Sequence, residues 1–107
     1  TGTVYNDAME VAALVAVFGE STPRLPVSAI KGAIGHTLGA AGAFEAVLCA
    51  RALLEGVLPP SAGCEELEEG CPLDLVRAPR RGDFRLALST SSAFAGNNAA
   101  VVVRRLD

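Results

Sequence analysis

The chain has 107 residues and a net charge of −3, from 9 basic and 12 acidic side chains, and half of its residues are hydrophobic. This length allows one small core and excludes a multidomain enzyme within these residues. The charge balance argues against binding of nucleic acid through its phosphates. A mean hydropathy of +0.38 with only 20% charged residues is high for a small domain, which has a large surface to cover with polar groups. The composition therefore predicts a piece that packs against more protein.

Cysteine and histidine usage points to a reducing, cytoplasmic setting and to no metal site. There are three cysteines and one histidine, and the spacing of Cys64 and Cys71 matches no zinc signature. No signal peptide is visible at the first residues. The longest apolar stretch, Gly32–Ala50, is interrupted by His36 and Glu45 and is too short in strongly apolar residues to predict a membrane span.

A first helix is predicted to begin near Asn6 and Asp7, which are residue types that cap helices, and to end at Gly19. One apolar stripe at helical spacing supports it, made of Val11, Leu14, Val15 and Phe18. The short β-branched stretch Pro26–Ile30 then predicts a buried strand.

A second helix is predicted from His36 or Thr37 to about Glu55, with Gly56 as its stop signal. This segment is apolar on nearly all sides of the helix. A helix of that kind is usually buried, so we expect this one to lie inside the fold.

The remaining segments complete a mixed α/β order of helix, strand, helix, strand, strand. Val57–Pro60 ends regular structure, and the charged run within Ser61–Arg81 predicts one long solvated loop. Alternation predicts a strand at Phe84–Leu88, and Ala99–Val103 predicts a second one, with the small polar loop Ser89–Asn98 between them. The short connection allows these two strands to pair antiparallel.

The densest candidate site is the stretch from Lys31 to Gly42, where the predicted strand leads into the second helix. If His36 lies at the helix N-terminus, the helix dipole disfavours its charged form. A neutral imidazole there can donate an N–H to a developing oxyanion or enolate. The alternative is a helix packed tightly through small residues, with His36 as a capping or core group, and the pattern alone leaves that alternative open. A phosphate-binding module is a weaker option, because Lys31 precedes the glycines and neither nucleotide-binding fingerprint is present.

A second candidate is the loop Ser89–Asn98, in which Phe94 is the one large side chain among small neighbours. Such a ring is either a plug in the core or a gate over a pocket. Loops of small residues that hold one conspicuous side chain often carry function, but the residues do not choose between these two roles.

Four motifs in order resemble the β-ketoacyl-acyl carrier protein synthases, the condensing enzymes of fatty-acid and polyketide assembly. The string Lys31-x4-His36-Thr-Leu-Gly-Ala-Ala-Gly is similar to the second-histidine motif of that family. Thr1-Gly-Thr3 resembles the end of its His-Gly-Thr-Gly-Thr motif, and Val57–Pro60 resembles its Gly-x-x-Pro-Pro segment. Ser89–Asn98 resembles its Ser-Asn-Ser-Phe-Gly-Phe-Gly-Gly-x-Asn loop. The resemblance implies that residues 1–107 are the C-terminal portion of a ketosynthase with a thiolase-like α/β fold, and that the N-terminal half lies outside the chain.

The resemblance also implies a role for each matching residue. His36 corresponds to one of two histidines that stabilise the malonyl-derived enolate, and Lys31 to a lysine that orders the active site through an acidic partner. Thr1 and Thr3 correspond to threonines that bind the phosphopantetheine arm. Phe94 corresponds to the gating phenylalanine, whose N–H contributes to the oxyanion hole. The implied partners are an acyl carrier protein and a second subunit in a homodimer, with no cofactor beyond the carrier's phosphopantetheine.

The nucleophilic cysteine and the first histidine of the family have no match in the chain, so these residues alone are not expected to condense anything. Ser92 stands where the family usually has phenylalanine, and Ala93 and Ala95 stand where it usually has glycine. Alanine resists backbone angles that glycine allows, so the gating loop is expected to move less or to take another shape. A non-catalytic partner subunit that sets chain length in a heterodimer is the alternative function.

Overall fold

The computed structural model describes all 107 residues, and the contacts between residues group them into two compact units. Residues 1–36 and 59–79 form the first unit, and residues 37–58 and 80–107 form the second. No helix is long and apolar enough to cross a membrane.

The first unit begins with helix α1, Val4–Phe18, which continues into a 3-10 turn, η1, at Gly19–Arg24. Thr22 holds this junction together: it is buried, and its Oγ1 donates to the carbonyl of Gly19 at 2.8 Å. α1 begins slightly before the predicted cap, because Thr3 is the extended residue at its N-terminus and Asp7 already lies in the first turn. The Asp7 carboxylate instead accepts the Gly2 N–H at 3.1 Å.

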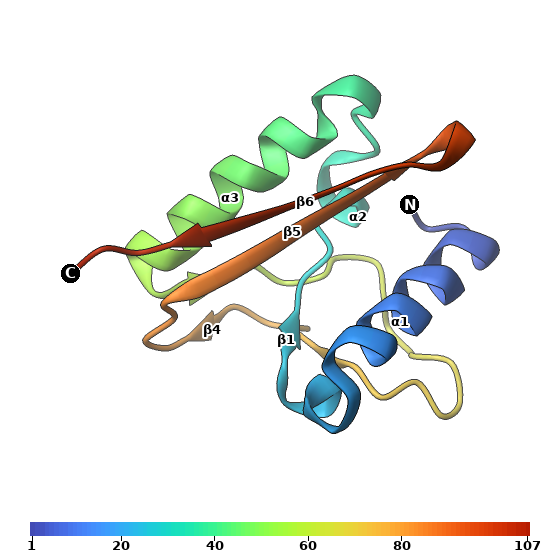
Figure 1. Cartoon of the computed structure of the whole chain (residues 1–107). Helices are drawn as coiled ribbons and strands as arrows, with labels where there is room; N and C mark the ends of the chain where they lie inside the picture. The colour runs from blue at the N-terminus through green and yellow to red at the C-terminus, as the bar shows by residue number, and fades with distance from the viewer. The chain divides into compact units, whose positions relative to one another are not determined.

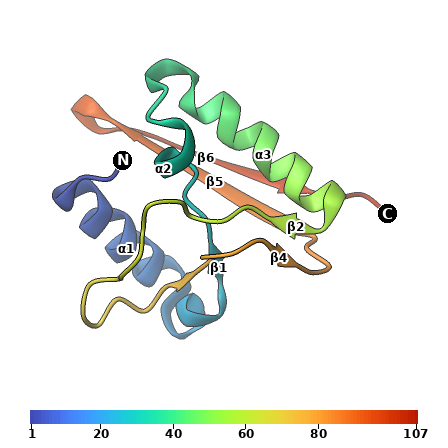
Figure 2. The ribbon, with the colours of Figure 1, turned by 180° about the vertical axis from the view of Figure 1, so that it is seen from behind.

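Three segments that are distant in sequence lie side by side at the centre of this unit. The two-residue strands β1, Pro26–Val27, and β3, Asp74–Leu75, pair in parallel, and the Val76 N–H continues the pairing to the Val27 carbonyl at 2.8 Å. Ser61 connects the segments that follow the two strands, because its N–H donates to the Val76 carbonyl at 2.7 Å and its Oγ accepts the Ala29 N–H at 2.9 Å. Figure 2 shows β1 passing below the short helix α2, Lys31–Ile34.

These strands correct two predictions for the first unit. The predicted strand Pro26–Ile30 is paired only at its first two residues. The predicted loop Ser61–Arg81 does expose its four glutamates, but its second half contributes β3 and Val76, which is completely buried. A two-residue strand paired with a segment about 48 positions away in sequence leaves no local pattern.

The second unit is a helix packed on a β-hairpin (Figure 1). Helix α3, Ala41–Glu55, packs against strands β5, Leu86–Ala93, and β6, Asn97–Arg104, which pair antiparallel along their whole length. The small sheet β2–β4, Val57–Leu58 with Arg80–Arg81, lies beside the helix end. The helix stops at Gly56 as predicted, because that residue is left-handed at φ 63° and its N–H bonds the Ala52 carbonyl.

The hairpin is longer than the sequence predicts. The predicted loop Ser89–Asn98 is almost all strand, since only Phe94–Gly96 lies outside the ladder, as the 3-10 turn η3. Serine and alanine are poor strand markers, so their pattern indicates a loop; here they pair instead, and the small side chains of β5 let α3 approach closely. Gly42 in the first turn of α3 lies so near that a Cβ there would be 3.5 Å from the Ser91 Oγ.

Few apolar side chains are buried within these residues, namely Ala52, Leu53 and Val76. The prediction that α3 is a buried helix fails for one side of it, because Phe44, Val47 and Leu54 are exposed. The hairpin face opposite Ser89, which touches the helix, is also apolar and exposed; it carries Leu86, Leu88 and Val102. These uncovered surfaces agree with the expectation that the piece packs against more protein.

Candidate functional site

Lys31 and His36 flank one tight turn in the first unit. Lys31 is the first residue of α2 and is half-buried, and its carbonyl accepts the Gly35 N–H at 2.8 Å. Gly35 then reverses the chain with φ 77° and ψ 173°, a conformation that only glycine adopts without strain. His36 follows directly and is exposed. The conformation of Gly35 thus sets the backbone direction at His36.

Gly32 within α2 has a second, spatial reason to be glycine. A Cβ built on it would fall on the carbonyl oxygen of Ala62. The backbone of α2 therefore lies directly against the segment that follows Pro60. Because Lys31 immediately precedes Gly32, this contact also positions the backbone of Lys31.

The prediction that His36 lies at a helix N-terminus is wrong. A short 3-10 turn, η2, occupies Leu38–Ala40, and α3 begins only at Ala41. Leu38, the first residue of η2, has a positive φ of 52°, which lies outside the α-helical range, so α3 cannot extend back to His36. The dipole argument for a neutral imidazole therefore does not apply, although a histidine N–H remains able to donate to an oxyanion.

Thr1 and Thr3 lie together immediately before α1. Their hydroxyl oxygens are 2.8 Å apart and both residues are exposed. Such a pair presents donors and acceptors to one polar group. The structure therefore places in the first unit four of the five predicted site residues, which are Thr1, Thr3, Lys31 and His36.

Phe94, the fifth, lies in the second unit at the tip of the β5–β6 hairpin. Its side chain is 99% exposed, so within these residues it is not a plug in the core. Ala95 has φ 61° and ψ 24°, which is the left-handed region that alanine enters only with strain, whereas Ala93 is extended at φ −133°. Of the two alanines that stand at glycine positions of the family loop, only Ala95 is strained.

Glu45 is a polar residue of the second unit for which the sequence predicts no role. It is half-buried on α3, and its Oε2 accepts a hydrogen bond from the Ser89 Oγ at 3.1 Å. One carboxylate in an otherwise apolar helical segment was the available signal. Burial raises the pKa of the Cys49 thiol one turn further along, and the Glu45 carboxylate raises it more. Cys49 is therefore a poor nucleophile, as its place in an apolar helix predicts.

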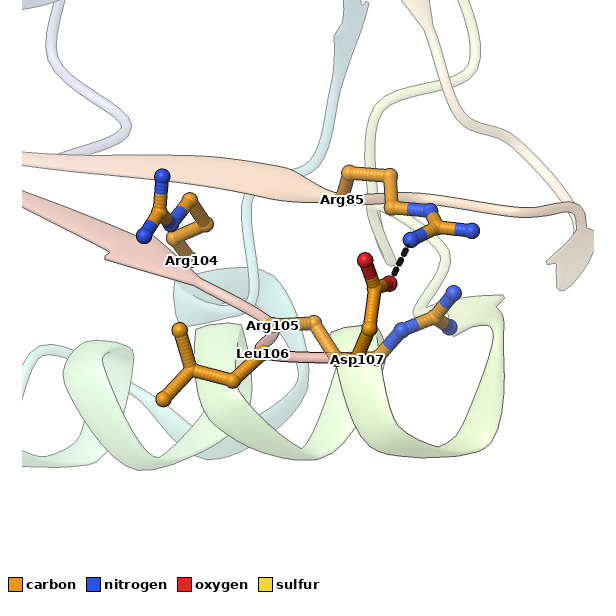
Figure 3. A pocket seen from close by; sticks show the side chains of 5 residues that line it. All are labelled: Arg85, Arg104, Arg105, Leu106 and Asp107. Carbon is orange, nitrogen blue, oxygen red and sulfur yellow. Dashed lines mark hydrogen bonds and ion pairs between the residues drawn. The ribbon is translucent and has the colours of Figure 1, made fainter.

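Figure 3 shows a basic depression, which is lined by residues at the opposite end of the hairpin from Phe94. It has a volume of about 260 Å³ and is lined by Arg85, Arg104, Arg105, Leu106 and Asp107. Arg105 donates to the Leu53 carbonyl near the end of α3 at 3.1 Å and also bonds Asp83, while Arg85 bonds Asp83 and Asp107. Hydrogen bonds from Arg105 and Arg85 hold the pKa of Asp83 below its usual value. Two of these arginines therefore connect the helix, the hairpin and the preceding loop.

Comparison with known proteins shows which family shares this sequence. A family model described as "Beta-ketoacyl synthase, C-terminal domain" matches residues 1–65, which is more than half of the chain. The tetracenomycin polyketide synthase ketoacyl synthase alpha subunit of Streptomyces glaucescens is 42% identical over 106 residues, which cover 98% of this chain and 25% of that protein.

Two solved structures match the fold over nearly the whole chain. The ishigamide ketosynthase/chain length factor aligns with a TM-score of 0.91 and 41% identity, over 100% of this chain and 26% of that one. The ketosynthase complex AntDE:AntF, a type II polyketide synthase acyl-carrier protein with its ketosynthase bound to the hexaketide, aligns with a TM-score of 0.92 and 30% identity, over 98% of this chain and 26% of that one.

The α/β arrangement is thus that of the thiolase-like ketosynthases, as the motifs predicted. The chain belongs to the β-ketoacyl synthase family and matches its C-terminal domain. It spans about a quarter of the length of the curated relatives it matches.

Proposed function

We propose that the chain is the C-terminal portion of a β-ketoacyl-acyl carrier protein synthase and supplies part of its condensing site. One observation carries the proposal: a family match along the chain retains the Lys31-x4-His36 motif, on a turn that glycine geometry fixes. The nucleophilic cysteine and the first catalytic histidine belong, in this proposal, to a longer protein that contains these residues.

The proposed reaction has two steps. A cysteine thiolate attacks the thioester carbonyl of an acyl carrier, the carbon–sulfur bond to phosphopantetheine breaks, and the released thiolate takes up a proton. A malonyl thioester then loses CO₂, and the electron pair of the broken bond forms an enolate. The enolate carbon attacks the acyl-cysteine carbonyl, so that a carbon–carbon bond forms and the cysteine leaves as thiolate.

His36 has the most direct role in this scheme. An N–H donor placed at the enolate oxygen stabilises charge that develops only during decarboxylation, which is where such donors act most strongly. His36 is exposed within these residues and lies directly after the Gly35 turn. Lys31, at the start of α2, is proposed to order the site from the other side of the same turn.

The carrier is proposed to be recognised by the remaining site residues. The paired hydroxyls of Thr1 and Thr3 suit the amide groups of a phosphopantetheine arm, and the exposed Phe94 ring is placed as a gate. An acyl-carrier protein accompanies the ketosynthase in one structural relative, which supports this class of partner. A dimeric assembly and a cytoplasmic location complete the proposal.

The test uses the longer protein that carries these residues. His36→Ala should lower malonyl decarboxylation by about 10²–10³-fold, the usual effect of removing one such donor, while acylation of the cysteine continues. His36→Asn, which keeps an N–H donor, should retain more activity than the alanine variant. Unchanged decarboxylation in His36→Ala would exclude the proposed role.

A non-catalytic subunit that sets chain length is the second candidate. Its support is that one structural relative is a ketosynthase/chain length factor and that Ser92 and Ala95 depart from the family's loop. The longer protein would then form no acyl-enzyme by itself, but would change the product length made by a catalytic partner. Measuring acyl-enzyme formation by intact mass separates the two candidates.

A further inference from the structure

The tip of the β5–β6 hairpin is held by two side-chain amides of its own residues. The Asn97 Nδ2 donates to the Phe94 carbonyl at 3.2 Å, and the Asn98 Nδ2 donates to the Gly96 carbonyl at 3.3 Å. Between them the backbone takes two left-handed residues in succession, Ala95 and Gly96. The tip is therefore a strained turn closed by short-range hydrogen bonds.

The Asn97 bond matters most for Phe94. The Phe94 ring is almost completely exposed, so packing within these residues does not orient it. Its carbonyl belongs to the peptide plane that Phe94 shares with Ala95, and rotation of that plane is the ψ rotation of Phe94. An amide bonded to that carbonyl therefore restricts the orientation of Phe94. The strand pairing does not restrain this residue, because its last pair is Ala93 with Asn97.

We propose that Asn97 is a positioning residue for Phe94, whose amide holds the tip in the orientation used for acyl transfer. The inference rests on the proposed function, which makes Phe94 a gate and an oxyanion-hole donor. Asn97 touches neither substrate nor reacting atoms in this proposal. Because Ala95 strains the turn, the tip depends on this bond more than an unstrained glycine turn would.

The experiment compares three variants of the longer protein with the unchanged protein. Asn97→Ala removes the amide, Asn97→Thr keeps a hydroxyl donor at the same position, and Asn6→Ala is the matched control. The control also loses one hydrogen bond of an asparagine side chain, from the Asn6 Nδ2 to the Glu10 carboxylate at 3.0 Å on α1, in the other unit. Acyl transfer from a carrier protein is measured per acylable site, together with the melting temperature.

Loss of one exposed hydrogen bond should lower the per-site kcat of Asn97→Ala by about three- to tenfold, with an unchanged KM for the carrier. Asn97→Thr should recover part of this loss, and Asn6→Ala should keep the full kcat. If Asn97 has a merely structural role, Asn97→Ala and Asn6→Ala should lower the melting temperature equally, and the per-site kcat of Asn97→Ala should not change. That result, or an equal loss of kcat in both alanine variants, overturns the inference. If the unchanged protein itself forms no acyl-enzyme, the proposed function fails instead.

Discussion

Replacing Ala95 with glycine should stabilise the hairpin tip, while the same replacement two residues earlier should destabilise it. Ala95 lies in the left-handed region at φ 61° and ψ 24°, and Ala93 is extended at φ −133° and ψ 167°. The two substitutions remove the same methyl group from one short segment. Only the backbone angles differ, so the pair separates conformational strain from the loss of side-chain contacts.

The expected magnitude follows from these angles. An alanine in the left-handed region costs about 1–2 kcal/mol that glycine avoids. The greater freedom of glycine in the unfolded chain destabilises the folded state by about 0.5–1 kcal/mol and so offsets part of this gain. Ala95→Gly should therefore stabilise the tip by about 0.5–1 kcal/mol. Ala93→Gly relieves no strain and should cost about the entropic 0.5–1 kcal/mol.

Hydrogen exchange at the hairpin amides is the suitable assay, because it reports local opening rather than unfolding of a whole large protein. In the longer protein, amides near the tip should exchange about two- to fivefold more slowly in Ala95→Gly and more rapidly in Ala93→Gly. Amides at the Leu86 end of the hairpin serve as an internal reference. Exchange that changes in the same direction in both variants would show that the angle at residue 95 is not what limits the stability of the tip.

Two further predictions concern the rest of the chain. Gly32→Ala should lower the unfolding free energy by about 1–3 kcal/mol, because its methyl group would overlap the Ala62 carbonyl. The control, Gly39→Ala, should be tolerated, because a Cβ at that position meets nothing within 4 Å. Denaturation midpoints measure both effects, and equal effects would contradict the reasoning. The second concerns Asp83, whose pKa in the folded protein is lowered by its arginine partners, so its contribution to stability is present above about pH 4 and is lost as the pH falls through the folded-state pKa. Acid titration of unfolding should therefore be less steep in Asp83→Asn below about pH 4, and an unchanged acid profile would remove Asp83 from the account.

The sequence predicts those elements whose signals are local. The first helix and the end of the second follow from apolar spacing and from Gly19 and Gly56, and both are found within a few residues of the prediction. The strand predicted at Pro26–Ile30 is too long and β3 is not predicted at all, because these two-residue strands exist only through pairing with each other. The start of α3 was placed too early, since apolar periodicity does not reveal the positive φ of Leu38.

The candidate site was predictable as a motif and less so as geometry. The motif identifies Lys31 and His36 as candidates, but the apolar pattern of the segment predicts a helix N-terminus at His36 that the structure does not contain. The sequence does not predict Glu45 as a half-buried acceptor, because its partner, Ser89, lies 44 positions away. The strain at Ala95 could be suspected from its place in the loop, yet the assignment of strain to Ala95 rather than Ala93 needs the backbone angles.

Arg105 fixes the hairpin at its base, so a small rotation there is amplified at the tip. Its bond to the Leu53 carbonyl fixes the base of the strands to the end of α3, and its bond to Asp83 fixes it to the loop before β5. Eight residues at about 3.4 Å each make each strand about 27 Å long, and Phe94 lies at its far end. A tilt of about 5° at the base would carry such a lever about 2 Å at the tip. Substitutions at Arg105, which lies at the opposite end of the hairpin from Phe94, should therefore disturb the orientation of Phe94.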